Sequence, residues 1–312
     1  MTHPANMSTT WSRDAIVVGG GPAGLSAALL LGRCLRDTLV IDAGRPRNES
    51  SPAMHAFLSR DGIPPADFLR IGREQLELYS SVEFRHGKVA TAKREGGEFR
   101  INLESGDTYL AKSLLLATGL VDKLPEIEGF RNYYGTNVHH CPYCDGWECR
   151  NERIGVLGGD QPALDLADEL RQWTRDIVLF PNGADLTGKT IPSGIKVRHG
   201  SVTSLTGSDR ILHGVRLAGG TQVTVDRLFF VPQQVQHCTL AAQLGCDKAS
   251  AGPWVECNED GSTCVPGVYV AGNAGNRVQM AILAAAEGLR AAISLNEWLQ
   301  EAARSPVASV AP

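Results

Sequence analysis

The feature that most constrains the fold is a glycine-rich turn between two apolar runs near the N-terminus. Residues 14–18 have the composition of a buried parallel strand, and residues 25–31 have that of a helix. The sequence between them is Gly19-Gly20-Gly21-Pro22-Ala23-Gly24, which fits the pattern GxGxxG. The first glycine of this pattern permits a tight turn, the second lets a pyrophosphate approach the backbone, and the third allows close packing of helix on strand. The pattern therefore predicts a doubly wound α/β domain that binds a dinucleotide.

A second strand, predicted over residues 38–42, strengthens this interpretation. It ends in Asp42, which lies 23 residues after Gly19. A carboxylate about 20 residues beyond the first glycine holds a ribose hydroxyl in dinucleotide sites. A glycine-rich turn with no ligand is the alternative, and the register of strand, turn, helix and acid disfavours it.

The rest of the chain repeats this organisation. Residues 114–119 form a buried strand that ends in a glycine turn, and residues 153–158 begin a second strand–turn–helix unit with a helix to about Trp173. A further strand over 267–273 precedes an alanine-rich helix from about Val278 to Glu301. The fold class expected is α/β with two doubly wound, Rossmann-like dinucleotide-binding domains.

Composition agrees with a soluble globular protein of about two domains, since the chain has 312 residues, of which 43% are hydrophobic and 21% charged. A net charge of −4 without a basic stretch predicts neither a nucleic-acid partner nor a membrane surface. Residues 1–13 are polar and lack the apolar core of a signal peptide. The eight cysteines are scattered apart from one pair, which indicates the reducing cytoplasm.

That pair lies in the sequence His139-His140-Cys141-Pro142-Tyr143-Cys144-Asp145-Gly146. Two cysteines separated by two residues can alternate between a dithiol and a disulfide. Proline after the first cysteine suits the first turn of a helix, and the helix N-terminus lowers the pKa of the leading thiol. A thiolate in such a pair attacks disulfides, and the oxidised pair accepts attack from substrate thiols.

Three other roles are open to cysteines at this spacing. His139, His140, Cys141 and Cys144 carry zinc-ligating atoms, but they crowd into six residues and no second cysteine pair follows at finger-like spacing, so no metal is predicted. Haem attachment requires histidine directly after the second cysteine, where Asp145 stands. Two buried structural cysteines remain an alternative, which the dinucleotide turn makes less attractive because it supplies a redox partner.

The order of these motifs resembles the low-molecular-weight thioredoxin reductase family of FAD-containing disulfide oxidoreductases. The resemblance rests on the Gly19–Gly24 turn, the Ala117-Thr118-Gly119 turn, the cysteine pair followed by Asp145-Gly146, and Val270-Ala271-Gly272. It implies that residues 1–122 and 236–312 form a discontinuous FAD-binding domain. Residues 123–235 would form an inserted NADPH-type domain that carries the cysteine pair. It also implies a homodimer.

The resemblance also implies roles for single residues. Cys141 would be the exposed interchange cysteine and Cys144 the flavin-proximal one. A base is needed for the substrate thiols, and His140 or His139 has the intrinsic pKa for it, while Asp145 occupies the family's acid–base position. The residues expected to bind FAD are Gly19, Gly21, Pro22, Ala23, Gly24, Asp42, Gly44, Arg47, Val89, Ala117, Thr118, Gly119, Gly272, Asn273 and Gln279, the last at the start of a helix that faces the flavin.

The second dinucleotide turn departs from the family pattern. It reads Gly158-Gly159-Asp160-Gln161-Pro162-Ala163, with Asp160 in the place of the glycine that admits pyrophosphate. The following strand ends at Phe180, and no arginine or lysine follows before Lys189 to hold the 2′-phosphate of NADPH. The nucleotide site is therefore predicted to be vestigial, the alternative being a working site with a different backbone path.

A flavin and a cysteine pair without a hydride donor must exchange electrons with another partner. The pattern resembles the branch of thioredoxin-reductase-like dithiol oxidases that close disulfides in sulfur-bridged natural products. The function expected is oxidation of a small-molecule dithiol, with electrons passing to FAD and then to O2 to give H2O2. The alternatives are an NADPH- or ferredoxin-dependent disulfide reductase and a non-catalytic flavoprotein that binds or senses disulfides.

Overall fold

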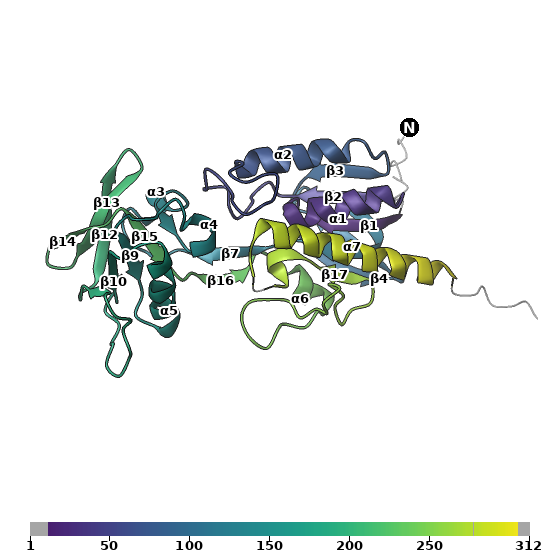
Figure 1. Ribbon diagram of the computed structural model, residues 1–312. Coiled ribbons are helices and arrows are strands. Elements are labelled where there is room, and N and C mark those ends of the chain that lie inside the picture. The colour runs from purple at the N-terminus through teal and green to yellow at the C-terminus, as the bar shows by residue number, and fades with distance from the viewer. Residues whose placement is uncertain (1–11, 277, 305–312) are drawn as a thin grey trace, which may run out of the picture. The chain divides into compact units, whose positions relative to one another are not determined.

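The computed structural model describes residues 12–276 and 278–304, which include the predicted strand–turn–helix units (Figure 1). Contacts divide the chain into two compact units. Among the described residues, the first contains 12–47, 66–121, 235–276 and 278–304, and the second contains 48–65 and 122–234. No helix in the described ranges is long and apolar enough to span a bilayer.

The first unit is built on a seven-stranded sheet with the order β3-β2-β1-β6-β5-β4, in which β17 also pairs with β6. Strands β3, β2, β1, β6 and β17 run parallel, whereas β4, β5 and β6 form an antiparallel extension. Its strands are β1 (Ser12–Val18), β2 (Thr38–Asp42), β3 (Val82–His86), β4 (Val89–Glu95), β5 (Glu98–Leu103), β6 (Thr108–Leu116) and β17 (Val268–Val270). Its helices are α1 (Pro22–Arg33), α2 (Pro65–Leu76), α6 (Leu240–Leu244), the 3-10 turn η2 (Gly272–Ala274) and α7 (Ala281–Arg304).

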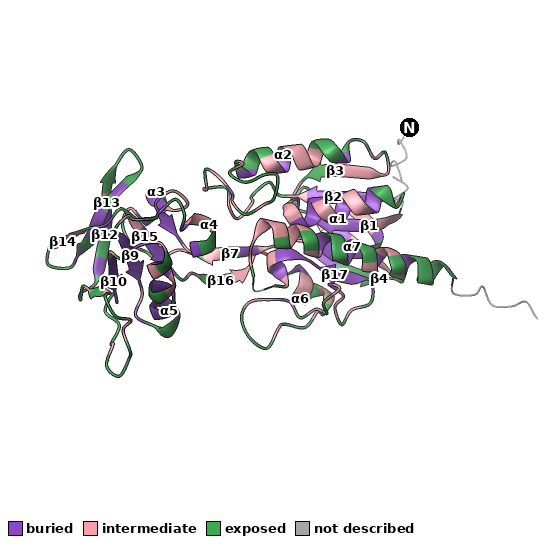
Figure 2. Ribbon diagram, viewed as in Figure 1, coloured by how far each residue is buried: buried purple, intermediate pink, exposed green. Residues whose placement is uncertain are grey.

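Strand β1 is buried on both faces, as its apolar run predicts (Figure 2). Ala15 and Val17 pack in the cluster that contains α1 and α7, whereas Ile16 and Val18 pack in the cluster on the opposite face of the sheet. Alternate side chains of a strand point to opposite faces, so one apolar segment serves two cores. Because these strands run parallel, their carboxyl ends lie together at one edge of the sheet.

The second unit contains a wholly parallel five-stranded sheet with the order β11-β10-β9-β15-β8, and a separate antiparallel sheet β12-β13-β14. The strands are β8 (Val138–His139), β9 (Ile154–Leu157), β10 (Ile177–Phe180), β11 (Lys196–Val197), β12 (Val202–Ser208), β13 (Ile211–Leu217), β14 (Gln222–Thr224) and β15 (Arg227–Phe230). The helices are α3 (Phe130–Tyr133), α4 (Pro142–Asp145), α5 (Gln161–Glu169) and the 3-10 turn η1 (Leu170–Gln172). The parallel strands in the two sheets, with helices between them, confirm the predicted α/β class with two Rossmann-like folds.

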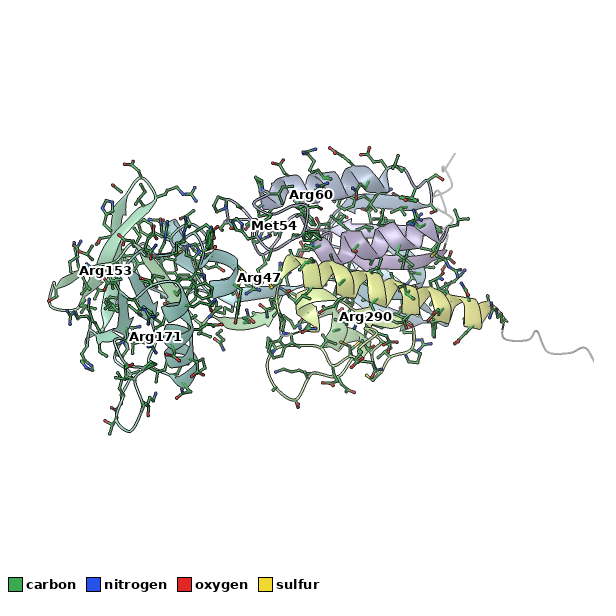
Figure 3. The ribbon with its side chains drawn as sticks, in the orientation of Figure 1. Arg47, Met54, Arg60, Arg153, Arg171 and Arg290 are labelled. Atoms are coloured by element: carbon green, nitrogen blue, oxygen red, sulfur yellow. A yellow bond between two sulfur atoms is a disulfide. The ribbon has the colours of Figure 1, made fainter. Side chains whose placement is uncertain are left out.

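Between the units the chain passes through β7 (Leu120–Lys123) and β16 (Gln233–Gln236), which pair as a two-stranded sheet. Residues 48–65 depart from the expected division, since they cluster with the second unit. Ser50 lies against Gly135, where a Cβ atom would stand only 2.6 Å from the serine Cβ. Within the segment, Met54, which Figure 3 labels, forms a β-bridge with Ile63 and is buried.

Two helices differ in length from their sequence predictions. Helix α5 ends at Glu169 and continues as η1 to Gln172, so the predicted end near Trp173 holds only if the 3-10 turn is included. Helix α7 begins at Ala281 rather than near Val278. Gln279 therefore lies two residues before that helix and does not start it.

Candidate active site

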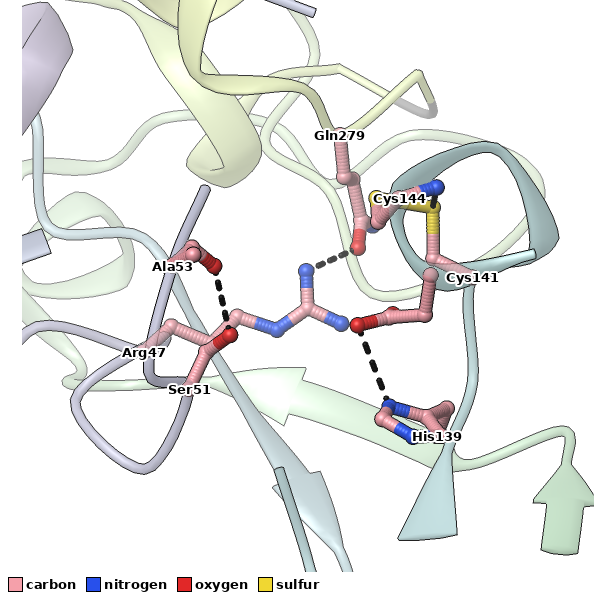
Figure 4. Close-up of a disulfide and its surroundings, with 8 residues drawn as sticks. Arg47, Ser51, Ala53, His139, Cys141, Cys144 and Gln279 are labelled. Carbon is pink, nitrogen blue, oxygen red and sulfur yellow. Dashed lines mark hydrogen bonds and ion pairs between the residues drawn. A yellow bond between two sulfur atoms is a disulfide. The ribbon is translucent and has the colours of Figure 1, made fainter. Parts of the chain in front are cut away.

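Cys141 and Cys144 form a disulfide with their Cα atoms 5.3 Å apart (Figure 4). Cys141 is the N-cap of α4 and Pro142 is its first helical residue, as the sequence predicted. The Cys141 sulfur accepts a hydrogen bond from the Cys144 backbone N–H at 3.2 Å. An N–H group directed at this sulfur stabilises it when it carries thiolate charge.

The cysteine pair follows directly after β8, at the carboxyl end of an edge strand of the parallel sheet. Gly146 makes the short helix possible, because a Cβ atom there would lie 2.7 Å from the Trp173 ring and 2.5 Å from the Pro142 carbonyl oxygen. The indole thus packs directly beneath the segment that carries the two sulfurs.

His139 and Asp145 lie side by side next to the disulfide, with 3.1 Å between His139 Nδ1 and Asp145 Oδ1. The imidazole is only 7% exposed and lies against the Phe229 ring at a centroid distance of 5.3 Å. A carboxylate that accepts the Nδ1 proton fixes the tautomer and makes Nε2 the basic nitrogen. This arrangement can hold or release one proton next to the sulfur pair.

His140, the other candidate base, has different surroundings. It is half-buried, and its ring stacks on Tyr134 at 6.3 Å with an angle of 21° between the planes. The Tyr134 hydroxyl donates to Asp122 Oδ2 at 2.9 Å. The structure thus brings His139 to Asp145 and places His140 against a tyrosine.

The segment 48–65 reaches the same region of the second unit through His55. The Nε2 atom of His55 lies 3.6 Å from Glu148 Oε1, and its Nδ1 atom lies 3.5 Å from Asp61 Oδ1. Asp61 also accepts the Ala56 backbone N–H at 2.8 Å. A surface loop that includes residues 55–62 is therefore connected to the turn after the cysteine pair.

Cys149 is buried five residues after Cys144. Burial raises the pKa of its thiol to about 12. A thiol with that pKa is not a nucleophile near neutral pH. The redox chemistry of this segment is therefore confined to Cys141 and Cys144.

In the first unit, the Gly19–Gly24 turn has the close contacts that its sequence pattern predicts. Gly19 has φ +109°, and a Cβ atom there would lie 2.3 Å from the Ala117 carbonyl oxygen. A Cβ atom on Gly24 would lie 1.8 Å from the Gly19 carbonyl oxygen, whereas one on Gly21 would meet nothing within 4 Å. The turn is thus closely packed at Gly19 and Gly24 and open at Gly21, the glycine that a pyrophosphate would approach.

Asp42 ends β2 at the same edge of the sheet, and its Oδ1 accepts the Gly20 backbone N–H at 3.0 Å. Gly44 and Gly119 have positive φ values and open space around the position of a Cβ atom. A backbone cradle with room at three glycines and a carboxylate at the strand end fits the adenosine diphosphate half of FAD.

Other residues predicted to bind FAD lie in other segments of the first unit. A Cβ atom on Gly272 would lie 3.0 Å from Ala23 Cβ, so the Gly272–Asn273 turn packs on the start of α1. Arg47 donates a hydrogen bond to Gln279 (Figure 4). Val89 is buried in the core at the start of β4.

One residue of this site was missed by sequence reasoning. Glu287, within α7, accepts the Gly272 backbone N–H at 2.9 Å and the Asn276 side-chain amide at 2.6 Å. The only sequence signal is an acidic residue in the otherwise apolar run Ala284-Ala285-Ala286-Glu287-Gly288.

The second turn differs from the first at its helix N-terminus. Asp160 is the N-cap of α5, and its Oδ1 accepts the Ala163 backbone N–H at 3.2 Å. Lys189 donates to the Gly159 carbonyl oxygen, and a Cβ atom on Gly159 would lie 2.7 Å from Ala184. The loop after β10 therefore packs on this turn and brings it a lysine that the sequence spacing did not predict.

Comparison with known proteins agrees with this architecture. Residues 13–288 match the family described as pyridine nucleotide-disulphide oxidoreductase. The chain is 31% identical over 330 residues to a probable thioredoxin reductase of Arthroderma benhamiae, covering 92% of this chain and 80% of that protein. It is 31% identical over 289 residues to thioredoxin reductase tcpT of Claviceps purpurea, covering 86% and 88% respectively.

Solved structures give the same result. The crystal structure of HlmI superposes with a TM-score of 0.89 at 37% identity, covering 93% of each chain. The putative thioredoxin reductase TrxB of Bacillus anthracis superposes with a TM-score of 0.88 at 32% identity, covering 93% of this chain and 99% of that one. The chain therefore belongs to the pyridine nucleotide-disulphide oxidoreductase family, as an FAD-binding oxidoreductase of the thioredoxin reductase type.

Proposed function

We propose that this protein is an FAD-dependent dithiol oxidase that forms a disulfide in a small-molecule dithiol and passes the electrons to O2. The observation that carries the proposal is the contrast between an open first turn and a second turn whose helix N-terminus is already capped by Asp160. With the pyridine nucleotide route blocked, electrons would enter through the Cys141–Cys144 disulfide.

The capped turn opposes NADPH binding in two ways. The Asp160 carboxylate already accepts the N–H group that a pyrophosphate would use, and its charge would repel the phosphates. Lys189 is the cation near the turn, and it is engaged by the Gly159 carbonyl oxygen. NADPH would have to displace both interactions before it gained any of its own.

The proposed reaction begins with thiol–disulfide exchange. A substrate thiolate attacks the Cys141 sulfur, which breaks the Cys141–Cys144 bond and releases Cys144 as a thiolate. The second substrate thiol then attacks the substrate sulfur of this mixed disulfide. The product disulfide closes, Cys141 leaves as a thiolate, and the protein retains the electron pair as a reduced cysteine pair.

The protons released by the substrate thiols require an acceptor, and the His139–Asp145 pair is in a position to be that acceptor. Both substrate thiols lose a proton, and a base of intermediate pKa adjacent to the sulfurs is required to accept one near neutral pH. His139, held by Asp145 at 3.1 Å, is the base in our proposal. His140, which stacks on Tyr134, would shape the surroundings instead.

FAD would be held by the Gly19–Gly24 turn, Asp42, the Ala117–Gly119 turn and Gly272–Asn273. When bound, FAD supplies the two-electron acceptor that reoxidises the cysteine pair and delivers the electrons to O2 as H2O2. The residues of the chain position it and exclude water, and the overall stoichiometry is one dithiol and one O2 consumed per disulfide and H2O2 formed.

Two exposed aromatic side chains suit an organic substrate. Tyr143 is 65% exposed and Trp147 is 67% exposed, and they are the two aromatic members of the exposed large hydrophobic set among the described residues. The Tyr143 ring meets Trp173 edge to face at 6.2 Å, and the Arg150 guanidinium covers one face of Trp147 at 4.3 Å. Rings held in this way offer an ordered apolar surface within three residues of Cys144.

The experiment that tests the proposal is an anaerobic titration of the flavin spectrum, with NADPH and separately with dithiothreitol. We expect the dithiol to bleach the flavin and NADPH to leave it oxidised, and we expect O2 uptake with H2O2 formation when air is admitted. The Cys144→Ser variant, with equal flavin content, is the matched control and should neither bleach nor turn over.

Other outcomes would identify the alternatives. Rapid bleaching by NADPH would make the protein an NADPH-dependent reductase, and bleaching by reduced ferredoxin but not by dithiols would make it a ferredoxin-dependent one. Binding of a dithiol without multiple turnover would make it a disulfide binder or sensor.

We further propose that the protein is a cytoplasmic homodimer. Leu283, Leu289 and Ile293 lie exposed along α7, where apolar side chains favour association. Sedimentation of the holoenzyme at micromolar concentration should give twice the mass of 33.4 kDa, and a monomer would contradict this part of the proposal.

A further inference from the structure

Glu287 connects both ends of the turn that follows β17. Its Oε2 atom accepts the Gly272 backbone N–H at 2.9 Å, and its Oε1 atom accepts the Asn276 side-chain amide at 2.6 Å. The two contacts span five residues of chain, with Asn273 between them. One carboxylate thus ties the two ends of the turn together, in addition to the backbone hydrogen bonds that Gly275 and Asn276 donate to the Gly272 carbonyl oxygen.

Helix α7 touches the first glycine-rich turn at the adjacent residue. A Cβ atom on Gly288 would lie 2.0 Å from the Ala23 carbonyl oxygen, so α7 and the start of α1 meet backbone to backbone. The Gly272 position lies against the same alanine, at 3.0 Å from its Cβ. Neighbouring residues of α7 therefore fix the Gly272–Asn276 turn relative to the Gly19–Gly24 turn.

The carboxylate is held in a partly dehydrated position. Glu287 is half-buried, and this burial raises the pKa of its carboxyl group. The hydrogen bonds from Gly272 and Asn276 and the charge of Arg290, which Figure 3 labels, act in the opposite direction and lower that pKa. A surface helix gains nothing from placing an acid where its charge is disfavoured. A role in holding the conformation of the Gly272–Asn276 turn would explain why an acid occupies residue 287.

We propose that Glu287 is a positioning residue for FAD, which acts through the Gly272–Asn276 turn and does not itself touch the reacting atoms. The inference rests on the FAD site proposed above, in which Gly272 and Asn273 receive the cofactor, and it is independent of whether O2 is the electron acceptor. By holding Gly272 and Asn276, Glu287 keeps the Asn273 segment in its binding conformation before the cofactor arrives, which reduces the ordering required on binding.

The test compares three variants of the full chain after removal and titration of FAD. Glu287→Ala removes both contacts, Glu287→Gln keeps the size and can accept one of the two N–H groups, and Glu297→Ala removes an exposed acid from the same helix as a matched control. We expect a dissociation constant for FAD that is about 10- to 100-fold higher for Glu287→Ala, with an intermediate value for Glu287→Gln and no change for Glu297→Ala.

A second measurement separates positioning from general stability. The visible circular dichroism of bound flavin should change in Glu287→Ala and recover in part in Glu287→Gln, while the unfolding temperature of the three cofactor-free variants stays close to that of the wild type. Equal FAD affinity in wild type and Glu287→Ala would overturn the inference. Loss of affinity matched by an equal loss in cofactor-free stability would also overturn it, since the role would then be structural. Absence of O2 uptake by the wild type would instead refute the oxidase and leave these titrations unaffected.

Discussion

The two glycine-rich turns of this protein occupy equivalent places in two parallel sheets, yet their helix N-termini are built in opposite ways. In the first, the N-cap is Gly21, which carries no side-chain cap and has open space around it. In the second, the N-cap is Asp160, whose carboxylate bonds to the third helical N–H. The positive N-terminus of a helix attracts an anion. The first turn leaves this position open for a ligand, whereas in the second turn the Asp160 carboxylate occupies it.

On our proposal, the second unit has kept its fold without keeping its nucleotide. The second unit keeps the parallel strands, the positive φ of Gly158 and a helix after the turn. A single side chain at the position equivalent to Gly21 satisfies the N–H group for which a nucleotide would compete. We infer that the second unit serves mainly as a scaffold that presents Cys141 and Cys144.

The largest effect, a loss of FAD binding, is expected when an aspartate N-cap like Asp160 is introduced into the first turn in place of Gly21. Gly21→Asp would place a carboxylate at the N-cap of α1, where it would bond to the helix and repel the FAD phosphates. Repulsion at that range costs several kcal/mol, which corresponds to an affinity loss of more than about 100-fold. We expect purified Gly21→Asp to lack the flavin absorbance and all dithiol turnover.

The control for this variant is cofactor-free wild type, whose circular dichroism and unfolding temperature Gly21→Asp should match. Full flavin content in a folded Gly21→Asp protein would break the comparison, because an N-cap carboxylate could then no longer explain the loss of a nucleotide site.

The next effect concerns the route by which electrons enter. If they enter through sulfur, the His139→Gln variant should reduce the rate of flavin reduction by a dithiol about 10²- to 10⁴-fold, the range for loss of a general base. Stopped-flow bleaching measures this rate. His140→Gln is the matched control one residue away, and we expect it to lose less than about tenfold because in our proposal His139, and not His140, is the base. An equal loss in both variants would contradict the assignment of His139.

A smaller effect, on stability alone, is expected when the Asp160 side chain is removed from the second turn. Asp160→Ala removes the N-cap of α5, which lowers the free energy of unfolding by about 1 kcal/mol. Dithiol turnover should stay at the wild-type value, since in our proposal no electron passes through this turn. Urea denaturation and O2 uptake measure the two quantities, and Asp165→Ala, which removes an exposed acid within the same helix, is the control. A loss of turnover in Asp160→Ala would show that the second turn still takes part in the reaction.

Local patterns in the sequence were sufficient for much of the fold and of the site. The GxGxxG turn, the buried strands and the Pro142 helix start are determined by residues within a few positions of one another, so their geometry could be predicted. Contacts over long separations could not. Lys189 meets Gly159 across 30 residues, and Glu287 meets Gly272 from a different element, because the packing of loops and helices brings them together.

The choice between His139 and His140 shows the same limit. Both flank the cysteine pair in sequence and have the same intrinsic pKa, so spacing alone left either as the base. Their difference arises because β8 directs His139 into the sheet, against Phe229, and toward Asp145. The clustering of residues 48–65 with the second unit has a similar origin, in contacts such as Ser50 against Gly135.

The smallest expected effect is on the pH dependence of stability, and it tests whether the sheet of the second unit acts only as a scaffold. At the amino ends of β9 and β10, Asp176 accepts hydrogen bonds from Arg153 at 2.7 Å and Lys196 at 2.9 Å. These bonds, first from Lys196 and then from Arg153, hold the pKa of the Asp176 carboxyl below its ordinary value. A carboxyl whose pKa is lowered by folding stabilises the protein above its unfolded-state pKa, and this contribution is lost as the pH falls through the folded-state pKa.

Asp176→Asn should therefore flatten the decline of stability on acidification, by less than about 1 kcal/mol because these side chains are partly solvated. Unfolding temperature between neutral and acid pH measures it. Asp168→Asn, which removes the exposed partner of Arg171, is the control and should leave the decline unchanged. Dithiol turnover at neutral pH should be that of the wild type in both variants. If Asp176→Asn instead reduced turnover, the sheet would influence the chemistry beyond holding the cysteine pair. The contrast between a first turn that binds a cofactor and a second turn that serves only the fold would then no longer be tenable.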